Sequence, residues 1–218
     1  MNKNEQFVIT INRELGSGGR TVGRLLAEKL GVPFYDKALI QYLEEKFNLT
    51  SEEIEKQKGK KHGWWEDFKR VASIGEGFGL VSSDVRNTNA SGELEKLTTE
   101  DMFRVESELL RGIAETESCV IAGRSAFFIL QQHPNHLSIL IQASTDCRVE
   151  RVARKQDMTE EEARKAIERV DKMRENYVSH YTGTSRYDTR NYDIVLRSDG
   201  KTEEEIVDII MQYIGYLA

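Results

Sequence analysis

The sequence predicts an α/β fold in which a parallel sheet is covered by helices on both faces. Two observations support this prediction: short apolar runs alternate with stretches of helical periodicity, and the first run leads into a helix through a glycine-rich turn. Buried strands of a parallel sheet are short and apolar on both faces, which is the character of all these runs. The predicted strands span residues 7–11, 32–35, 119–122, 137–141 and 193–196.

Capping boxes predict where three helices start. In each, a threonine is followed three residues later by a glutamate, so that side chains satisfy the first backbone N–H groups of the helix. The three threonines are Thr50, Thr159 and Thr202. The last of these helices has one apolar face, and we expect it to cover the sheet.

Residues 48–98 interrupt the alternation of strands and helices. They are rich in Lys, Glu, Gly, Ser and Asn and have no strand pattern, so we interpret them as an insertion and not as a second core. Trp64 and Trp65 lie there among basic residues. We interpret this pair as an anchor for a helix, on its own domain or on a partner subunit, in preference to a surface that stacks on nucleic acid.

The composition excludes several classes of protein. With 39% hydrophobic and 31% charged residues in 218, the chain has enough apolar residues for a core and is not disordered as a whole. The net charge of −6 argues against nucleic acid as the main partner. No apolar stretch is long enough to span a membrane, and the first residues lack a signal-peptide pattern. We therefore expect a cytoplasmic protein without a membrane partner, and a homodimer stays open.

Two other residue types bear on metal and redox chemistry. Cys119 and Cys147 lie in or beside apolar runs, so we expect free thiols and not a disulfide or a metal site. His133 and His136 lie in a short polar link without a nearby cysteine or carboxylate pattern, so we interpret residues 133–136 as a surface turn.

Residues 12–21, which we call the glycine loop, connect the first strand to the first helix. Backbone N–H groups at such a turn converge on one anion, and the helix dipole favours negative charge there. Arginine side chains would neutralise phosphate oxygens, and a threonine hydroxyl would reach a magnesium ion. We predict phosphate binding here in preference to a plain turn. The predicted ligands are Arg13, Gly16, Ser17, Gly18, Gly19, Arg20 and, for the metal, Thr21.

These segments resemble the cytidylate kinase-like group of the P-loop nucleoside monophosphate kinases, over most of the chain. The resemblance implies a single domain, residues 1–218, with the three-layer P-loop kinase fold: a five-stranded parallel sheet with helices on both faces. It also implies an acceptor-binding helical insertion at 36–100 and a lid at 148–190. The segments that carry the resemblance are 9–20, 27–37, 119–124, 142–151, 171–174 and 192–196.

The resemblance also implies the ligands and the residue roles. ATP and Mg²⁺ are the expected cofactors, and nucleotides are the expected small-molecule substrates. Arg124 matches an arginine that contacts the nucleoside monophosphate, and Arg148 and Arg151 match arginines that hold ATP. We expect the acceptor to lie between Asp36 and Arg124, and we assign catalytic roles to Arg20, Arg151, Asp171 and Arg174.

The charges of the predicted lid agree with this interpretation. Lys and Arg outnumber Asp and Glu by 11 to 9 between residues 148 and 190, although the whole chain is acidic. Arg148 and Arg151 are three residues apart and can face one ligand from a helix, and Asp171 can orient Arg174 through the same spacing. Cations placed this way stabilise the charge that spreads over a phosphoryl group in transfer.

Three departures from the family pattern leave open which acceptor is phosphorylated and whether the protein turns over. The glycine loop has no Walker A lysine, so an arginine, Arg20 in one register, must substitute for it. The residues after Asp36 and the serine at 125 differ from those of cytidylate kinases. We therefore keep three hypotheses: a nucleoside monophosphate kinase, a kinase of another small metabolite, and a nucleotide-binding module without turnover.

Overall fold

The structure is a computed structural model that describes residues 1–36 and 99–217, apart from the side chains of residues 99, 101 and 102. The chain divides into two compact units, Met1–Ile40 with Glu106–Ala218, and Gln41–Val105. The description below concerns the first unit. The capping box at Thr50, the tryptophan pair and nearly all of the predicted insertion lie outside the described residues.

The five predicted strands form one parallel sheet in the order β2-β3-β1-β4-β5. The central strand β1 pairs on both sides, with Val8 opposite Cys119 and His136. Each strand falls within or beside a predicted apolar run, which confirms the sheet. The strands are β1 (Val8–Arg13), β2 (Phe34–Tyr35), β3 (Cys119–Ala122), β4 (His136–Gln142) and β5 (Ile194–Arg197).

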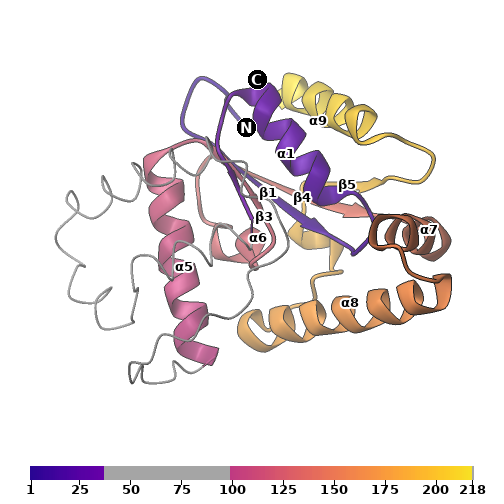
Figure 1. The fold of residues 1–218 in the computed structure, drawn as a ribbon. Helices are drawn as coiled ribbons and strands as arrows, with labels where there is room; N and C mark the ends of the chain where they lie inside the picture. Colours follow the sequence, from indigo (N-terminus) through magenta and orange to yellow (C-terminus); the bar gives the residue numbers. More distant parts are fainter. Residues whose placement is uncertain (37–98, 218) are drawn as a thin grey trace, which may run out of the picture. The chain divides into compact units, whose positions relative to one another are not determined.

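Helices cover both faces of this sheet, which gives the three layers (Figure 1). The capping box at Thr159 is complete, and Thr202 exchanges two hydrogen bonds with Glu205, so both of these predicted helix starts are confirmed. The helices are α1 (Gly19–Leu30), α5 (Thr99–Thr116), α6 (Ala126–Ile129), α7 (Thr145–Gln156), α8 (Glu160–Thr182), the 3-10 helix η1 (Thr189–Asn191) and α9 (Glu203–Leu217). Within the described ranges, none of them is long and apolar enough to cross a membrane.

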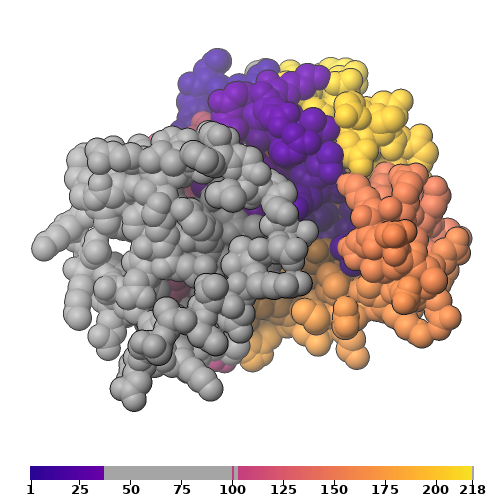
Figure 2. Space-filling view, viewed as in Figure 1, coloured from indigo at the N-terminus to yellow at the C-terminus, as the bar shows by residue number. Residues whose placement is uncertain are grey.

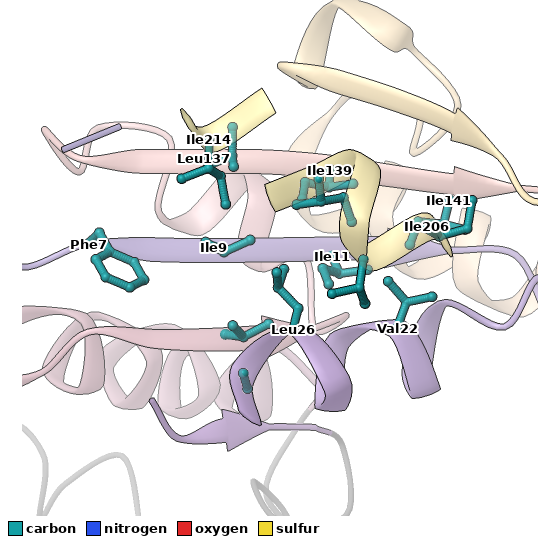
Figure 3. Close-up of a cluster of buried hydrophobic side chains, with 14 residues drawn as sticks. Phe7, Ile9, Ile11, Val22, Leu26, Leu137, Ile139, Ile141, Ile206 and Ile214 are labelled. Carbon is teal, nitrogen blue, oxygen red and sulfur yellow. The ribbon is translucent and has the colours of Figure 1, made fainter. Parts of the chain in front are cut away.

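The main core lies between the sheet and the pair α1 and α9 (Figure 3). Ile9 and Ile11 of β1, and Phe7 just before it, point to this side, as the two-residue period of a strand requires. Full burial of side chains of this size contributes about 1.5–3 kcal/mol each. On the other face, α6 and α8 pack Phe127 and Val178 against β4. The predicted role of the last helix as a cover is confirmed.

The topology fixes where a ligand can bind. The chain leaves β1 into α1 on one face of the sheet, and it leaves the neighbouring strand β3 into α6 on the other face. Loops that diverge from adjacent parallel strands open a crevice at the carboxyl edge, and ligands of open α/β sheets bind there. The glycine loop and the turn after β3 both lie at this edge of the sheet.

His136 is the first residue of β4 and not part of the turn predicted at 133–136. Its Nε2 lies 2.7 Å from the Thr10 hydroxyl oxygen. Burial lowers the pKa of His136 from 6.5 to about 4, with the carboxylate of Asp193 opposing the shift. Because the unfolded chain takes up a proton at higher pH than the folded one, the fold loses stability as the pH falls through 6.5 towards 4.

We expect His136→Gln to remove this part of the acid sensitivity. Urea unfolding at about pH 7 and about pH 4.5 should show that the wild type loses about 1–3 kcal/mol more than the variant over this range. His180→Gln, on α8, is the matched control and should keep the wild-type loss. An H136Q variant that loses as much stability in acid as the wild type would contradict the assignment.

Both cysteines are free, as predicted. Cys119 is buried in β3, and burial raises the pKa of its thiol, with Glu117 adding to the shift. A thiol of raised pKa carries little of the nucleophilic thiolate. Cys119 is therefore not suited to act as a nucleophile.

Candidate active site

The glycine loop presents a series of backbone donors at the start of α1. Gly16 and Gly18 have left-handed backbone angles, with φ of 86° and 81°, and Gly18 is the N-cap of α1. Within the described part of the chain, the N–H groups of Gly16, Gly18, Gly19, Arg20 and Thr21 have no hydrogen-bond partner. Donors arranged in this way at a helix N-terminus bind an oxyanion.

Two of the glycines are required by close contacts. A Cβ atom at Gly16 would lie 2.8 Å from the carbonyl oxygen of Arg148, and one at Gly19 would lie 2.6 Å from Cβ of Arg13. Both positions are too tight for any side chain. The loop is thereby pressed between β1 and α7, which fixes the direction of its N–H groups.

Two arginines of α7 hold the glycine loop through its carbonyl oxygens. Arg148 Nε donates to the carbonyl oxygen of Leu15 at 2.8 Å, and Arg151 Nη1 donates to that of Gly16 at 2.9 Å. In this structure both arginines therefore contact the glycine loop itself. In the space-filling view α1 and α7 border each other here (Figure 2). Direct contact of Arg148 and Arg151 with ATP stays a prediction.

Asp171 on α8 is the carboxylate on which this arrangement converges. Its Oδ1 accepts a hydrogen bond from the backbone N–H of Leu15 at 3.1 Å. Its side chain is 10% exposed and pairs with three guanidinium groups. These belong to Arg148, to Arg174 with Nη1 at 3.7 Å and to Arg186 with Nη1 at 3.5 Å. Asp171 therefore joins the lid helix to the glycine loop.

Arg186 is a component of the site that the sequence motifs do not indicate. Its side chain is 1% exposed, its Nη2 donates to the carbonyl oxygen of Arg13 and lies 3.4 Å from Oδ1 of Asn12, and its Nε has no hydrogen bond in the described residues. It lies within the predicted lid but outside every segment of family resemblance. Its position in an arginine-rich lid was the only available signal.

Arg13 is the least compensated cation of the site. Among the described residues its guanidinium has no hydrogen bond or ion pair, and it lies against Gly123, where any side chain would overlap it. Burial and the neighbouring charges of Arg174 and Arg186 lower its pKa to about 9, with Asp36 opposing the shift. A half-buried cation surrounded by cations requires an anion to balance it.

The residues predicted to bind the acceptor, Asp36 and Arg124, lie near Arg13. Arg20, in the first turn of α1, pairs with Asp36, with Nη2 and Oδ2 2.6 Å apart. The Arg20 side chain is 52% exposed, so a ligand can reach it. Arg124 follows Gly123 and pairs with Glu106 of α5. Thr21 is half-buried, and its hydroxyl has no hydrogen bond within the described ranges.

Among the predicted residues, the structure brings Arg13, Arg20, Asp36, Asp171 and Arg174 to the carboxyl end of β1. Arg13, which we assigned to ATP, also lies near the predicted acceptor residues, close to Asp36 and against Gly123. The catalytic and binding roles of all these residues stay predictions.

A parallel sheet with a glycine loop between its central strand and first helix, and arginine-rich helices against that loop, has the P-loop kinase fold. Within this class, the profile of the cytidylate kinase-like family matches residues 8–200, and the chain belongs to that family. The resemblance and the three-layer fold predicted from the sequence are both confirmed.

Known proteins similar to the chain include two solved structures and one curated relative. A solved structure of an uncharacterized protein from Eubacterium ventriosum superposes with a TM-score of 0.67 at 26% identity and covers 96% of this chain and 99% of its own. Shikimate kinase from Bacteroides thetaiotaomicron has a TM-score of 0.51 at 17% identity over 96% of this chain and 98% of its own, which supports the fold alone.

The third is a curated S-adenosylmethionine-dependent nucleotide dehydratase from Lacinutrix mariniflava. It is 25% identical over 208 residues, which make up 94% of this chain and 35% of the relative. The chain thus spans about a third of that protein, and its named activity does not pass to this chain.

Proposed function

We propose that the protein transfers a phosphoryl group from ATP to a nucleoside monophosphate. The observation that carries this proposal is the unpaired, half-buried Arg13 between the unpartnered N–H groups of the glycine loop and the Arg124 turn. Together, the N–H groups of the glycine loop, Arg13 and the Arg124 turn are suited to two phosphorylated ligands placed end to end. Membership of a kinase-like family and the P-loop kinase fold support a phosphotransferase.

The residues divide between two ligands in this proposal. The triphosphate of ATP lies along the N–H groups of the glycine loop, with Arg20 in place of the missing lysine. The acceptor lies between Asp36 and Arg124, and Arg13 faces the phosphates of both. Mg²⁺, when bound, neutralises charge on the β- and γ-phosphates, and the Thr21 hydroxyl is the side chain that we propose to hold it.

In this proposal the residues of the lid position the glycine loop and exclude water from the site. Asp171, through the N–H of Leu15, and Arg148 and Arg151, through carbonyl oxygens, keep the loop in its phosphate-binding shape. Arg174 lies beside the carbonyl oxygen of Arg13 and adds positive charge where the transferred group would pass. A lid that shuts water out favours transfer over hydrolysis.

Replacing Arg20 with alanine should weaken binding of a non-hydrolysable ATP analogue about tenfold, because one charge-assisted contact to phosphate is lost. Calorimetric titration in the presence of Mg²⁺ measures this directly. Arg24→Ala is the matched control: it lies one turn further along α1, its side chain is 51% exposed and it pairs with Glu28. Equal affinities in the two variants would remove Arg20 from the site.

A coupled assay tests the function. Purified protein is incubated with ATP, Mg²⁺ and, one at a time, CMP, UMP, AMP, GMP and non-nucleotide acceptors that bear a carboxylate or a phosphate. We expect one nucleoside monophosphate to increase ATP consumption well above the rate without acceptor. Turnover with a non-nucleotide only would make the protein a kinase of another metabolite. Tight nucleotide binding with no turnover would make it a binding module.

A further inference from the structure

The turn after β3 has an unusual backbone. Gly123, Arg124 and Ser125 are consecutive and all have left-handed angles, with φ of 87°, 55° and 52°. A non-glycine residue with a left-handed backbone loses about 1–3 kcal/mol of stability, and here two such residues are adjacent. Such strain persists only where the surrounding structure holds it. The turn therefore places the Arg124 side chain at the expense of local stability.

The Arg124 guanidinium is held from one end only. Its Nη1 pairs with Oε1 of Glu106, a residue of α5 whose side chain is 1% exposed. Its Nε and Nη2 are buried and have no hydrogen-bond partner within the part of the chain that the structure describes, and the same holds for the Ser125 hydroxyl. Buried donors in native proteins are nearly always satisfied, so these donors call for a ligand.

The two unsatisfied nitrogens are the ones that form a fork. Nε–H and the facing Nη2–H of a guanidinium point in parallel and bind two oxygens of one phosphate. Glu106 occupies the remaining nitrogen and leaves this fork to an oxyanion. The pairing with Glu106 also compensates the buried charge, so Arg124 can stay in place before the ligand arrives.

The second oxygen of Glu106 has a partner from the lid. The Tyr177 hydroxyl of α8 donates to Oε2 at 2.6 Å. Burial, together with the Glu106 carboxylate, raises the pKa of Tyr177, so its hydroxyl remains a donor at neutral pH. The Glu106 carboxylate therefore joins Arg124 to the lid helix.

Tyr177 lies on the face of α8 that already contacts the glycine loop. Asp171, Arg174 and Tyr177 are spaced by three residues, so they form one stripe on the helix. Along this stripe Asp171 contacts the N–H of Leu15, Arg174 the carbonyl oxygen of Arg13, and Tyr177 the acceptor-side glutamate. One helix face thus spans the distance from the predicted ATP site to Arg124.

We propose that Glu106 is a positioning residue that aims the Arg124 fork at the phosphate of the acceptor, and that Tyr177 ties this position to the lid helix. The inference rests on the proposed function for the identity of the acceptor, a nucleoside monophosphate. Glu106 and Tyr177 do not touch the reacting atoms. They act through Arg124, whose two vacant donors bind the phosphate side-on.

The test compares Glu106→Gln and Tyr177→Phe with the controls Glu108→Gln, on the same helix, and Tyr216→Phe, an exposed tyrosine of α9. Calorimetry measures binding of CMP, UMP, AMP and GMP, and separately of a non-hydrolysable ATP analogue. We expect both test variants to weaken binding of the preferred monophosphate about tenfold and to change binding of the ATP analogue less than about twofold. A residue that only stabilises the fold would affect the two ligands alike.

A spectroscopic measurement reports on the Arg124 guanidinium alone. In ¹H–¹⁵N spectra of the arginine Nε–H groups, the Arg124 signal, assigned by its loss in Arg124→Lys, should shift when the monophosphate is added. Tyr177→Phe removes a single hydroxyl, so the test stands even if Glu106→Gln does not fold. Unchanged monophosphate affinity in the folded variants, or no binding of any monophosphate by the wild type, would overturn the proposal. Monophosphate binding that responds as expected, without turnover, would refute the kinase function and leave this inference in place.

Discussion

Replacing Asp171 with alanine should lower the free energy of unfolding by about 3–5 kcal/mol, because it leaves buried guanidinium groups without their shared carboxylate. Arg148 and Arg186 are 8% and 1% exposed, so water cannot compensate their charges. The variant also loses the acceptor for the Leu15 N–H. Urea unfolding monitored by circular dichroism at neutral pH measures the loss.

Asp146→Ala is the control for this experiment. Asp146 also pairs with an arginine, Arg164 at 3.6 Å, but its side chain is 94% exposed. Exposed pairs contribute little, so we expect a change within about 0.5 kcal/mol. If D171A were as stable as D146A, Asp171 would not hold the arginines and the loop together, and the description of the lid contact would be wrong.

Replacing Arg13 with glutamine should raise stability and lower activity at the same time. Burial and two neighbouring arginines lower the pKa of Arg13 to about 9, so below that pH the folded state carries the cost of a cationic Arg13 that the unfolded chain does not carry. This cost declines only as the pH rises from about 9 towards 12.5, whereas a neutral side chain removes it at neutral pH. We expect the melting temperature of the ligand-free variant to rise by about 2–4 °C, which corresponds to about 1 kcal/mol in a domain of this size.

The same substitution removes the cation that we place between the two phosphates. We expect kcat/KM for the preferred acceptor to fall about 100-fold, the effect of losing a charge-assisted contact that strengthens in transfer. Differential scanning calorimetry measures the melting temperature, and the coupled assay measures kcat/KM. Arg154→Gln, whose side chain on α7 is 70% exposed, should change neither. A less stable R13Q protein with normal activity would show that Arg13 is structural.

The sequence predicts the secondary structure of the described residues well for a physical reason. Strands buried on both faces are continuous apolar runs, so residues 119–122 and 137–141 stand out without any alignment. Thr159 and Thr202 bind N–H groups only three residues away, and such local contacts are readable from spacing. The order of the strands depends on contacts remote in sequence, and the sequence analysis did not predict it.

The same distinction applies to the site. The spacing of Arg148 and Arg151 predicts that both face one ligand, which stays a prediction, and it does not reveal that both contact carbonyl oxygens of the loop itself. Arg186 and Glu106 were missed because no local pattern marks them. Arg186 meets Arg13 across 173 residues, and Glu106 meets Tyr177 across 71, so only the folded chain brings them together.

A crystal structure of the protein with a non-hydrolysable ATP analogue and Mg²⁺ is the most direct measurement. We expect the β-phosphate within hydrogen-bond distance of the N–H groups of Gly16, Gly18 and Gly19, and a guanidinium of Arg13 or Arg20 on the γ-phosphate. A nucleotide bound elsewhere, with no anion on the glycine loop, would contradict phosphate binding by this loop and the phosphoryl transfer that depends on it.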